Sequence, residues 1–160
     1  MLPANPADRR FEDYPVGTVF EFGSVTLTQD EIVAFARQFD PQDMHTDPAL
    51  ATAGPHGGII ASGWQTMGVM MRMFTDHYLP KNGLASPGVD EVRWPRPVRP
   101  GDTLRVRVTV TDARRSRSKP DRGLVNAFVE VLNQRDEPVL TVKPINMIRT
   151  RTPLPASGDA

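Results

Sequence analysis

Two residues that can exchange protons stand close together in the segment FDPQDMHTDPALA, residues 39–51. Asp40 supplies a carboxylate, and His45 supplies an imidazole whose ordinary pKa of about 6.5 suits proton transfer near neutral pH. Burial beside apolar Phe39 and Met44 is expected to raise the pKa of Asp40, and a pair with separated pKa values can perform acid and base steps together. The same segment also fits a polar turn, in which Asp40 ends a helix and His45 makes a structural hydrogen bond.

A helix that begins at Gly63 can complete such a site. Helix N-termini present unpaired N–H groups with partial positive charge, and glycine lets a carbonyl oxygen approach the backbone closely. A donor of this kind stabilises a developing oxyanion by roughly 3–4 kcal/mol. Gly58, in the preceding glycine pair, is expected to give the approach to the site its freedom. Further candidates for substrate contact are Gln42, Ser62 and Trp64.

Capping signals predict the helices that position these residues. Thr28 stands three residues before Glu31, which is the spacing of a capping box. This box opens an amphipathic helix that ends before Pro41, because the residue before a proline avoids the helical region. Pro48 is expected to start a second short helix, with Asp47 as its N-cap.

The rest of the chain predicts one sheet and one long helix. A β-rich stretch lies near residues 17–27, and the stretch 62–79 is apolar nearly all round, which predicts a helix buried on most sides. Its methionines fit a core or an acyl-chain tunnel. Four β-rich segments follow, two of which alternate clearly. We therefore predict an α+β fold, with a curved antiparallel sheet wrapped around the long central helix.

The order of elements resembles the hot-dog fold, and two motifs resemble the MaoC-like dehydratase or (R)-specific enoyl-CoA hydratase family. These motifs are DPQDMHTDP, residues 40–48, and GGIIASGW, residues 57–64. The resemblance implies a single hot-dog domain over 1–160, with its core at about 11–150. It also implies that Asp40 and His45 are the catalytic pair on one water and that Gly63 opens the central helix. Gln42-Asp43 replaces the family's usual Asn-Pro, and Met71 replaces a serine found in some members.

The resemblance implies a lyase that adds water reversibly, in syn geometry, to trans-2-enoyl thioesters and forms (R)-3-hydroxyacyl thioesters. The acyl carrier would be coenzyme A or an acyl-carrier protein, and the protein would be at least a homodimer. One alternative is a hot-dog thioesterase, although residues 62–75 lack the carboxylate such enzymes commonly carry there. The other is a non-catalytic acyl-binding subunit, which would be expected to lack Asp40 or His45.

Composition favours a cytoplasmic protein that binds neither nucleic acid nor membrane. The chain has 160 residues, no cysteine, and 19 basic and 19 acidic residues. Zero net charge does not favour an anionic partner, and the N-terminal segment lacks the apolar region of a signal peptide. We expect no cofactor and no metal site, because His45, Asp47 and His56 lack a compact ligand pattern.

Two peripheral features complete the expectations. An arginine-rich stretch at 114–122 reads as a hairpin tip, where Arg115 and Arg117 either contact the phosphates of coenzyme A or phosphopantetheine or are simply solvated. The segments up to about Tyr14 and from 151 to 160 are rich in proline and polar residues. Both are expected to be poorly ordered ends or wraps on the surface.

Overall fold

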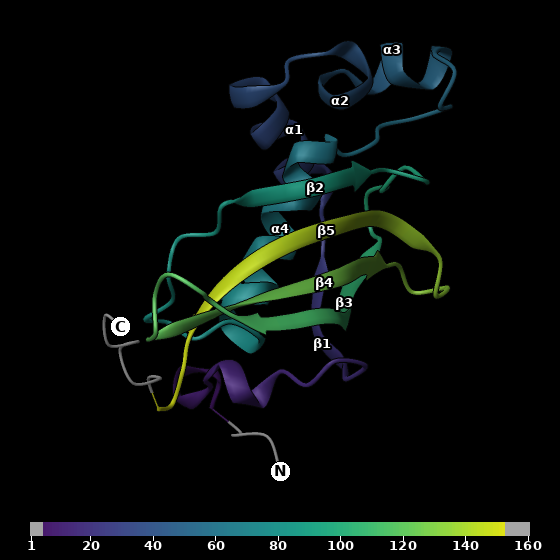
Figure 1. Ribbon diagram of the computed structural model, residues 1–160. Coiled ribbons are helices and arrows are strands. Elements are labelled where there is room, and N and C mark those ends of the chain that lie inside the picture. Colours follow the sequence, from purple (N-terminus) through teal and green to yellow (C-terminus); the bar gives the residue numbers. More distant parts are fainter. Residues whose placement is uncertain (1–4, 153–160) are drawn as a thin grey trace.

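Five antiparallel strands form one curved sheet in the computed structural model, which describes residues 5–152 (Figure 1). Their order across the sheet is β1-β3-β4-β5-β2, so β1 and β2 are the edge strands. The expectations for residues 1–4 and 153–160 lie outside the described part of the chain. The strands are β1 (Val19–Thr26), β2 (Gly88–Arg93), β3 (Thr103–Arg115), β4 (Arg122–Leu132) and β5 (Pro138–Arg149).

Alternation along the long strands places one face of the sheet in the core. In β3, Val106, Val108 and Val110 are buried, and the residues between them are partly exposed. Register shifts interrupt all four strand pairs, including a shift between Val110 and Asp112. Such bulges bend strands and increase their twist, which agrees with the curvature of the sheet around the central helix. The predicted sheet is thus confirmed.

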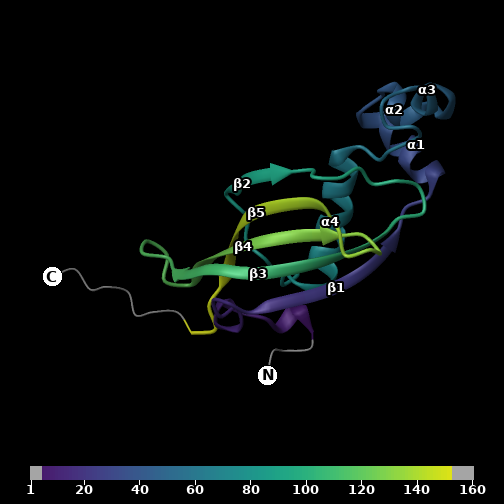
Figure 2. The same ribbon diagram turned by 90° about the vertical axis from the view of Figure 1, so that its right-hand side faces the viewer.

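The central helix α4 (Gly63–His77) lies against the sheet (Figure 2), and Ser62 is its N-cap. Its other end is held by the N-terminal segment, which contains two 3-10 turns, η1 (Pro6–Asp8) and η2 (Phe11–Asp13). Arg9 and the hydroxyl of Tyr14 donate hydrogen bonds to carbonyls at the end of α4. Residues 5–14 therefore wrap the surface, which was one of the two expectations for this segment.

Three helices, α1 (Gln29–Phe39), α2 (Asp43–Thr46) and α3 (Pro48–Ala53), gather beyond one end of the sheet, near the start of α4 (Figures 1 and 2). The predicted capping box is present, because Thr28 and Glu31 each accept a hydrogen bond from the other's backbone N–H. Asp47 caps α3 as predicted. The short helix α2 is additional: it forms within the segment that we predicted to be a turn.

One side of α4 is exposed, which corrects the prediction of a helix buried on most sides. Trp64 is 62% exposed and Met71 is 45% exposed, whereas Met70 and Phe74 are buried in the core. Hydrophobicity all round the helix therefore reflects a second apolar surface rather than complete burial. Among residues 5–152, none of the helices has the length and apolar character needed to cross a bilayer.

Candidate active site

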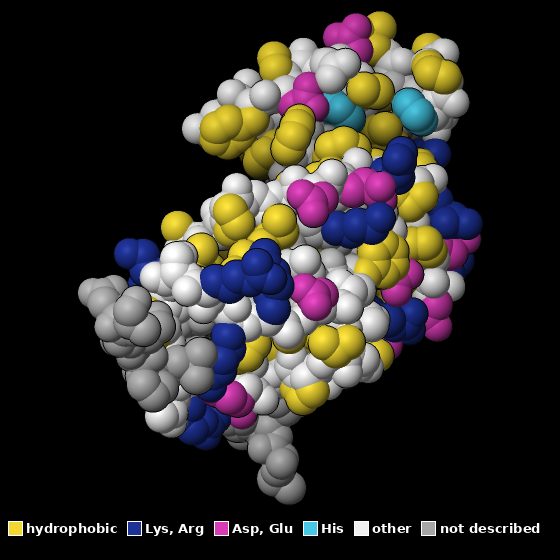
Figure 3. All heavy atoms as spheres, in the orientation of Figure 1, with side chains coloured by type: hydrophobic (Ala, Val, Ile, Leu, Met, Phe, Trp, Pro, Cys, Tyr) yellow, Lys and Arg dark blue, Asp and Glu magenta, His cyan; other side chains and the backbone are white. Residues whose placement is uncertain are grey.

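A cavity of about 440 Å³ lies where the helical end of the molecule meets the start of α4. Hydrophobic and histidine side chains gather at this end, and Lys and Arg side chains border it (Figure 3). Four sequence candidates line the cavity together with residues from the segment after β2. The wall includes Asp40, His45, Gly63, Trp64, Trp94 and Arg96.

Asp40 is the C-cap of α1, and two side chains donate hydrogen bonds to its carboxyl group. The amide of Gln42 donates to Oδ1 at 2.7 Å, and the hydroxyl of Ser62 donates to Oδ2 at 2.7 Å. Ser62 Oγ also accepts from the N–H of Trp64, so the hydroxyl proton remains for Asp40. Because both carboxyl oxygens accept hydrogen bonds, the arrangement suits the ionised form of Asp40.

Both hydrogen-bond donors lower the pKa of Asp40. The hydrogen bond from Gln42, followed by that from Ser62, lowers the pKa of Asp40, and the nearby His45 acts in the same direction. Burial acts against them but is the weaker influence, because the Asp40 side chain is 19% exposed and Phe39 points largely to solvent. The expectation that burial raises this pKa was therefore wrong: hydrogen bonding to the charged form outweighs desolvation.

His45 is buried on α2 and has only one arrangement of protons in its neutral form. Its Nδ1 lies 2.7 Å from the carbonyl oxygen of Ile60. A carbonyl oxygen only accepts, so Nδ1 must carry the proton, and the lone pair of the neutral ring is on Nε2. Nε2 faces Asp40 Oδ2 at 3.4 Å. The segment that contains Ile60 is itself held by backbone hydrogen bonds to Met44 and, through Ala61, to Val98.

Gly63 is the first residue of α4, and its N–H meets no acceptor among the described residues. A side chain at this position would be obstructed, because a Cβ atom on Gly63 would lie 2.6 Å from the indole of Trp94. That indole donates from Nε1 to the Gly63 carbonyl oxygen at 3.0 Å, and its ring meets Trp64 edge-on. Trp94 therefore holds the start of α4 against the end of β2.

The other predicted site residues are placed in different ways. Gln42 and Ser62 contact Asp40 rather than line the cavity. Gly58, in the loop between α3 and α4, has a positive φ of 151° and donates its N–H to the carbonyl of Ala51, but it does not line the cavity. That φ is one that glycine adopts readily.

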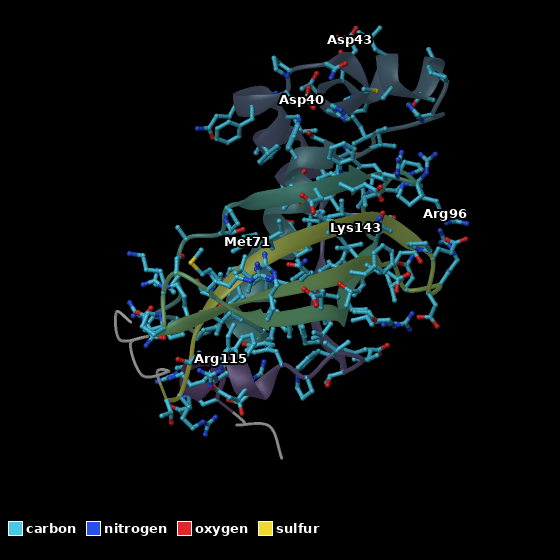
Figure 4. The ribbon with its side chains drawn as sticks, viewed as in Figure 1. Asp40, Asp43, Met71, Arg96, Arg115 and Lys143 are labelled. Atoms are coloured by element: carbon cyan, nitrogen blue, oxygen red, sulfur yellow. The ribbon has the colours of Figure 1, made fainter. Side chains whose placement is uncertain are left out.

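Arg115 and Arg117 are not brought to the site. Figure 4 shows Arg115 at the opposite end of the molecule from Asp40, where it pairs with Glu12 at 2.7 Å. Arg117 is exposed on the hairpin between β3 and β4. The hairpin tip is therefore remote from the cavity, and the cation in the cavity wall is Arg96.

The segment WPRPV, residues 94–98, contributes to the cavity and was missed as part of the site. Its residue types gave no signal of acid–base chemistry, so the sequence did not predict that it lines the site. His56, in the loop between α3 and α4, also lines the cavity. Within residues 5–152, no group of three or more acidic or histidine side chains is arranged to hold a metal ion.

The curved sheet wrapped around one helix is the hot-dog fold. A family model described as MaoC like domain matches residues 12–131. This match extends over most of the chain, from η2 into β4. The protein therefore belongs to the MaoC-like dehydratase domain family.

Individual relatives agree with this assignment. The uncharacterized protein YdeM of Bacillus subtilis is 30% identical over 128 residues, which cover 79% of this chain and 89% of that protein. The 3-hydroxyacyl-thioester dehydratase Z of Mycobacterium tuberculosis is 34% identical over 110 residues, covering 67% of this chain and 73% of that protein. The crystal structure of a MaoC-like dehydratase from Rhodospirillum rubrum has a TM-score of 0.84 and 36% identity, covering 90% of this chain and 99% of that one.

Proposed function

We propose that this protein is a hydratase/dehydratase that interconverts trans-2-enoyl and (R)-3-hydroxyacyl thioesters of coenzyme A or an acyl-carrier protein. One observation carries the proposal. Asp40 Oδ2 and His45 Nε2 lie 3.4 Å apart on the wall of a cavity that Gly63, the first residue of α4, also lines. Hydration of an enoyl thioester needs both a proton-transfer group and an oxyanion donor, and these residues can provide them.

The hydrogen bonds around the pair favour one way of holding water. The Asp40 carboxylate and Nε2 of neutral His45 both accept hydrogen bonds. Two acceptors 3.4 Å apart suit a water molecule that donates one O–H to each. The water oxygen then keeps its lone pairs free to face the substrate.

In the proposed reaction, the water oxygen forms a bond to the β-carbon of the enoyl group while His45 Nε2 removes one water proton. The electron pair of the double bond moves toward the thioester carbonyl. The developing negative charge on the carbonyl oxygen is stabilised by a hydrogen bond from the Gly63 N–H. The imidazolium is stabilised by the adjacent Asp40 carboxylate and gives its proton to the α-carbon on the same face. This sequence is a syn addition, and dehydration follows it in reverse.

The alternative activity for a protein with this fold is thioester hydrolysis. The described part of α4 carries one carboxylate, Asp76, which pairs with Arg72 at 2.7 Å on the exposed side of the helix and does not line the cavity. The cavity carboxylate is instead Asp40, in contact with a histidine. This arrangement favours addition of water to the double bond over hydrolysis at the thioester.

The function is tested by incubating the purified protein with crotonyl-CoA. Loss of the enoyl absorbance without release of free thiol is expected. Thiol release would instead identify a thioesterase. Absence of both changes on a broad panel of enoyl thioesters would contradict catalysis and favour an acyl-binding subunit.

Replacing Gln42 with alanine is expected to move the acid limb of the kcat/KM pH profile to higher pH. Gln42 provides the largest influence that lowers the pKa of Asp40. Its loss destabilises the charged carboxylate, so Asp40 takes up a proton at higher pH. Because the mechanism uses ionised Asp40, activity should decline sooner as the pH falls, while activity near neutral pH should stay close to that of the wild type.

The Gln42→Asn variant is the matched control, since it retains an amide and introduces the residue usual in the family. The informative quantity is the difference between the pH profiles of the wild type and the variants. An acid limb at the same pH in the wild type and the alanine variant would contradict the role of Gln42.

We expect the protein to be a homodimer formed through β2. This edge strand carries Val89, which is 45% exposed, and the exposed side of α4 with Met71 lies nearby. Unpaired sheet edges and apolar patches of this kind are usually covered. Light scattering of the purified protein should give twice the chain mass, and Val89→Glu should shift the protein toward monomer. A monomer in the wild type would contradict the expectation.

A further inference from the structure

The two peptide groups that meet at Gly63 are each held through a carbonyl oxygen. The Ser62 carbonyl, in the peptide that ends in the Gly63 N–H, accepts from the N–H of Thr66 at 3.1 Å in the first turn of α4. The Gly63 carbonyl accepts from a side chain outside α4, Nε1 of Trp94, at 3.0 Å. Because the backbone angles of Gly63 join these two peptide planes, fixing the second plane limits how far the first can turn.

The Trp94 ring takes the place of the side chain that Gly63 lacks. Three ring atoms would lie 2.6, 2.7 and 2.9 Å from a Cβ atom at this position, so the ring covers the α-carbon of Gly63 directly. Glycine has more backbone freedom than any other residue, which is unfavourable for a hydrogen-bond donor that must keep one direction. The ring contact and the indole hydrogen bond together restrict that freedom.

Trp94 can restrict Gly63 because its own segment, residues 94–98, is anchored at both ends. Arg93, the last residue of β2, is paired with β5. At the other end, Val98 is buried, and its carbonyl accepts from the N–H of Ala61 at 2.8 Å, close to the start of α4. The two prolines between these anchors have fixed φ angles. Segment 94–98 is therefore a short, stiff connection between the edge strand β2 and the start of α4.

Trp94 lies beside the cavity rather than in the core. It is 42% exposed, and both Trp94 and Gly63 line the cavity that contains the Asp40–His45 pair. A thioester oxygen that approaches the Gly63 N–H must therefore come close to the indole. The side chain that restricts Gly63 thus adjoins the reacting group.

We propose that Trp94 is a positioning residue for the reaction, because its indole fixes the Gly63 peptide in the direction that the thioester oxygen requires. This inference rests on the proposed function and adds a residue to its oxyanion site. A fixed donor needs no reorganisation when negative charge develops on the oxygen. A Gly63 peptide that can turn would bind the ground-state thioester almost as well but would stabilise the oxyanion less. The positioning role therefore predicts a loss of kcat without a matching loss of substrate affinity.

Trp94→Phe tests this role, because it keeps an aromatic ring at the position and removes the N–H donor. We expect kcat for crotonyl-CoA to fall about tenfold, which is part of the roughly 10²–10³ loss caused by removing an oxyanion donor. KM should change by less than about twofold. Calorimetry with butyryl-CoA, a saturated thioester that cannot be hydrated, should give the wild-type affinity and stoichiometry. An unchanged stoichiometry shows that the lower kcat does not come from unfolded protein.

Tyr14→Phe is the matched control, because it removes a similar hydrogen bond at the other end of α4. The Tyr14 hydroxyl donates to the carbonyl oxygen of Tyr78, the C-cap of that helix, at 2.7 Å. Both variants should have a lower thermal unfolding midpoint, since each loses a side-chain hydrogen bond to the backbone. Only Trp94→Phe should lose kcat.

Two results would overturn the inference and leave the proposed function intact. One is a wild-type kcat in Trp94→Phe, or equal losses of kcat in Trp94→Phe and Tyr14→Phe. The other is a loss of butyryl-CoA affinity as large as the loss of kcat/KM, because Trp94 would then act in ground-state binding. A wild-type protein that hydrates no enoyl thioester would contradict the proposed function, and the positioning role would be refuted with it.

Discussion

The His45→Ala variant is expected to lose at least about 100-fold in kcat for hydration of crotonyl-CoA. The His45 ring donates a hydrogen bond from Nδ1 to the Ile60 carbonyl oxygen, and its Nε2 faces Asp40. Alanine removes the group that takes the proton from water and returns it to the α-carbon. Because substrate binding also uses the rest of the cavity, KM should change far less than kcat. Steady-state kinetics on the variant and the wild type check this expectation.

His77→Ala is the matched control for that measurement. His77 is exposed at the other end of α4 and does not line the first cavity. The His77→Ala variant should retain wild-type kcat. Because His45→Ala removes a buried side chain, the folding of that variant is checked by circular dichroism. A folded His45→Ala protein with nearly normal kcat would refute the proposed mechanism.

The Asp40→Asn variant is expected to lose kcat by a similar factor, about 100-fold or more. The carboxylate accepts one hydrogen bond on each oxygen, from Gln42 and Ser62. Asparagine has only one acceptor oxygen, so its NH₂ group must face one of these donors in either orientation. The variant also removes the negative charge that stabilises the imidazolium of His45. Both effects act on the transition state, so kcat and kcat/KM should fall together.

Asp43→Asn provides the control, because Asp43 lies three residues away, is exposed and does not line the first cavity (Figure 4). The same chemical change there should leave kcat close to the wild-type value. Equal, small losses in the two variants would show that the carboxylate of Asp40 has no special role. A large loss confined to Asp43→Asn would place the functional carboxylate at the position where the family usually has proline.

The sequence predicted most of the local structure correctly. The Thr28–Glu31 capping box, the Asp47 cap and the alternating strands are all present. These features depend on contacts between residues a few positions apart, which periodicity and capping spacing report directly. The helix α2 was missed because four residues are too few to show periodicity.

The residue types at the site and the helix that begins at Gly63 could thus be predicted from local sequence patterns. The surroundings of these residues depend on how distant segments pack together. Ser62 lies 22 positions from Asp40, and Trp94 lies 31 positions from Gly63, yet each pair is hydrogen-bonded. The pKa of Asp40 depends on such contacts and on exposure, which are properties of packing. Packing also explains why the prediction for Arg115 failed. The distance between Arg115 and the cavity is set by how the strands pair, and this pairing could not be predicted from the residue types alone.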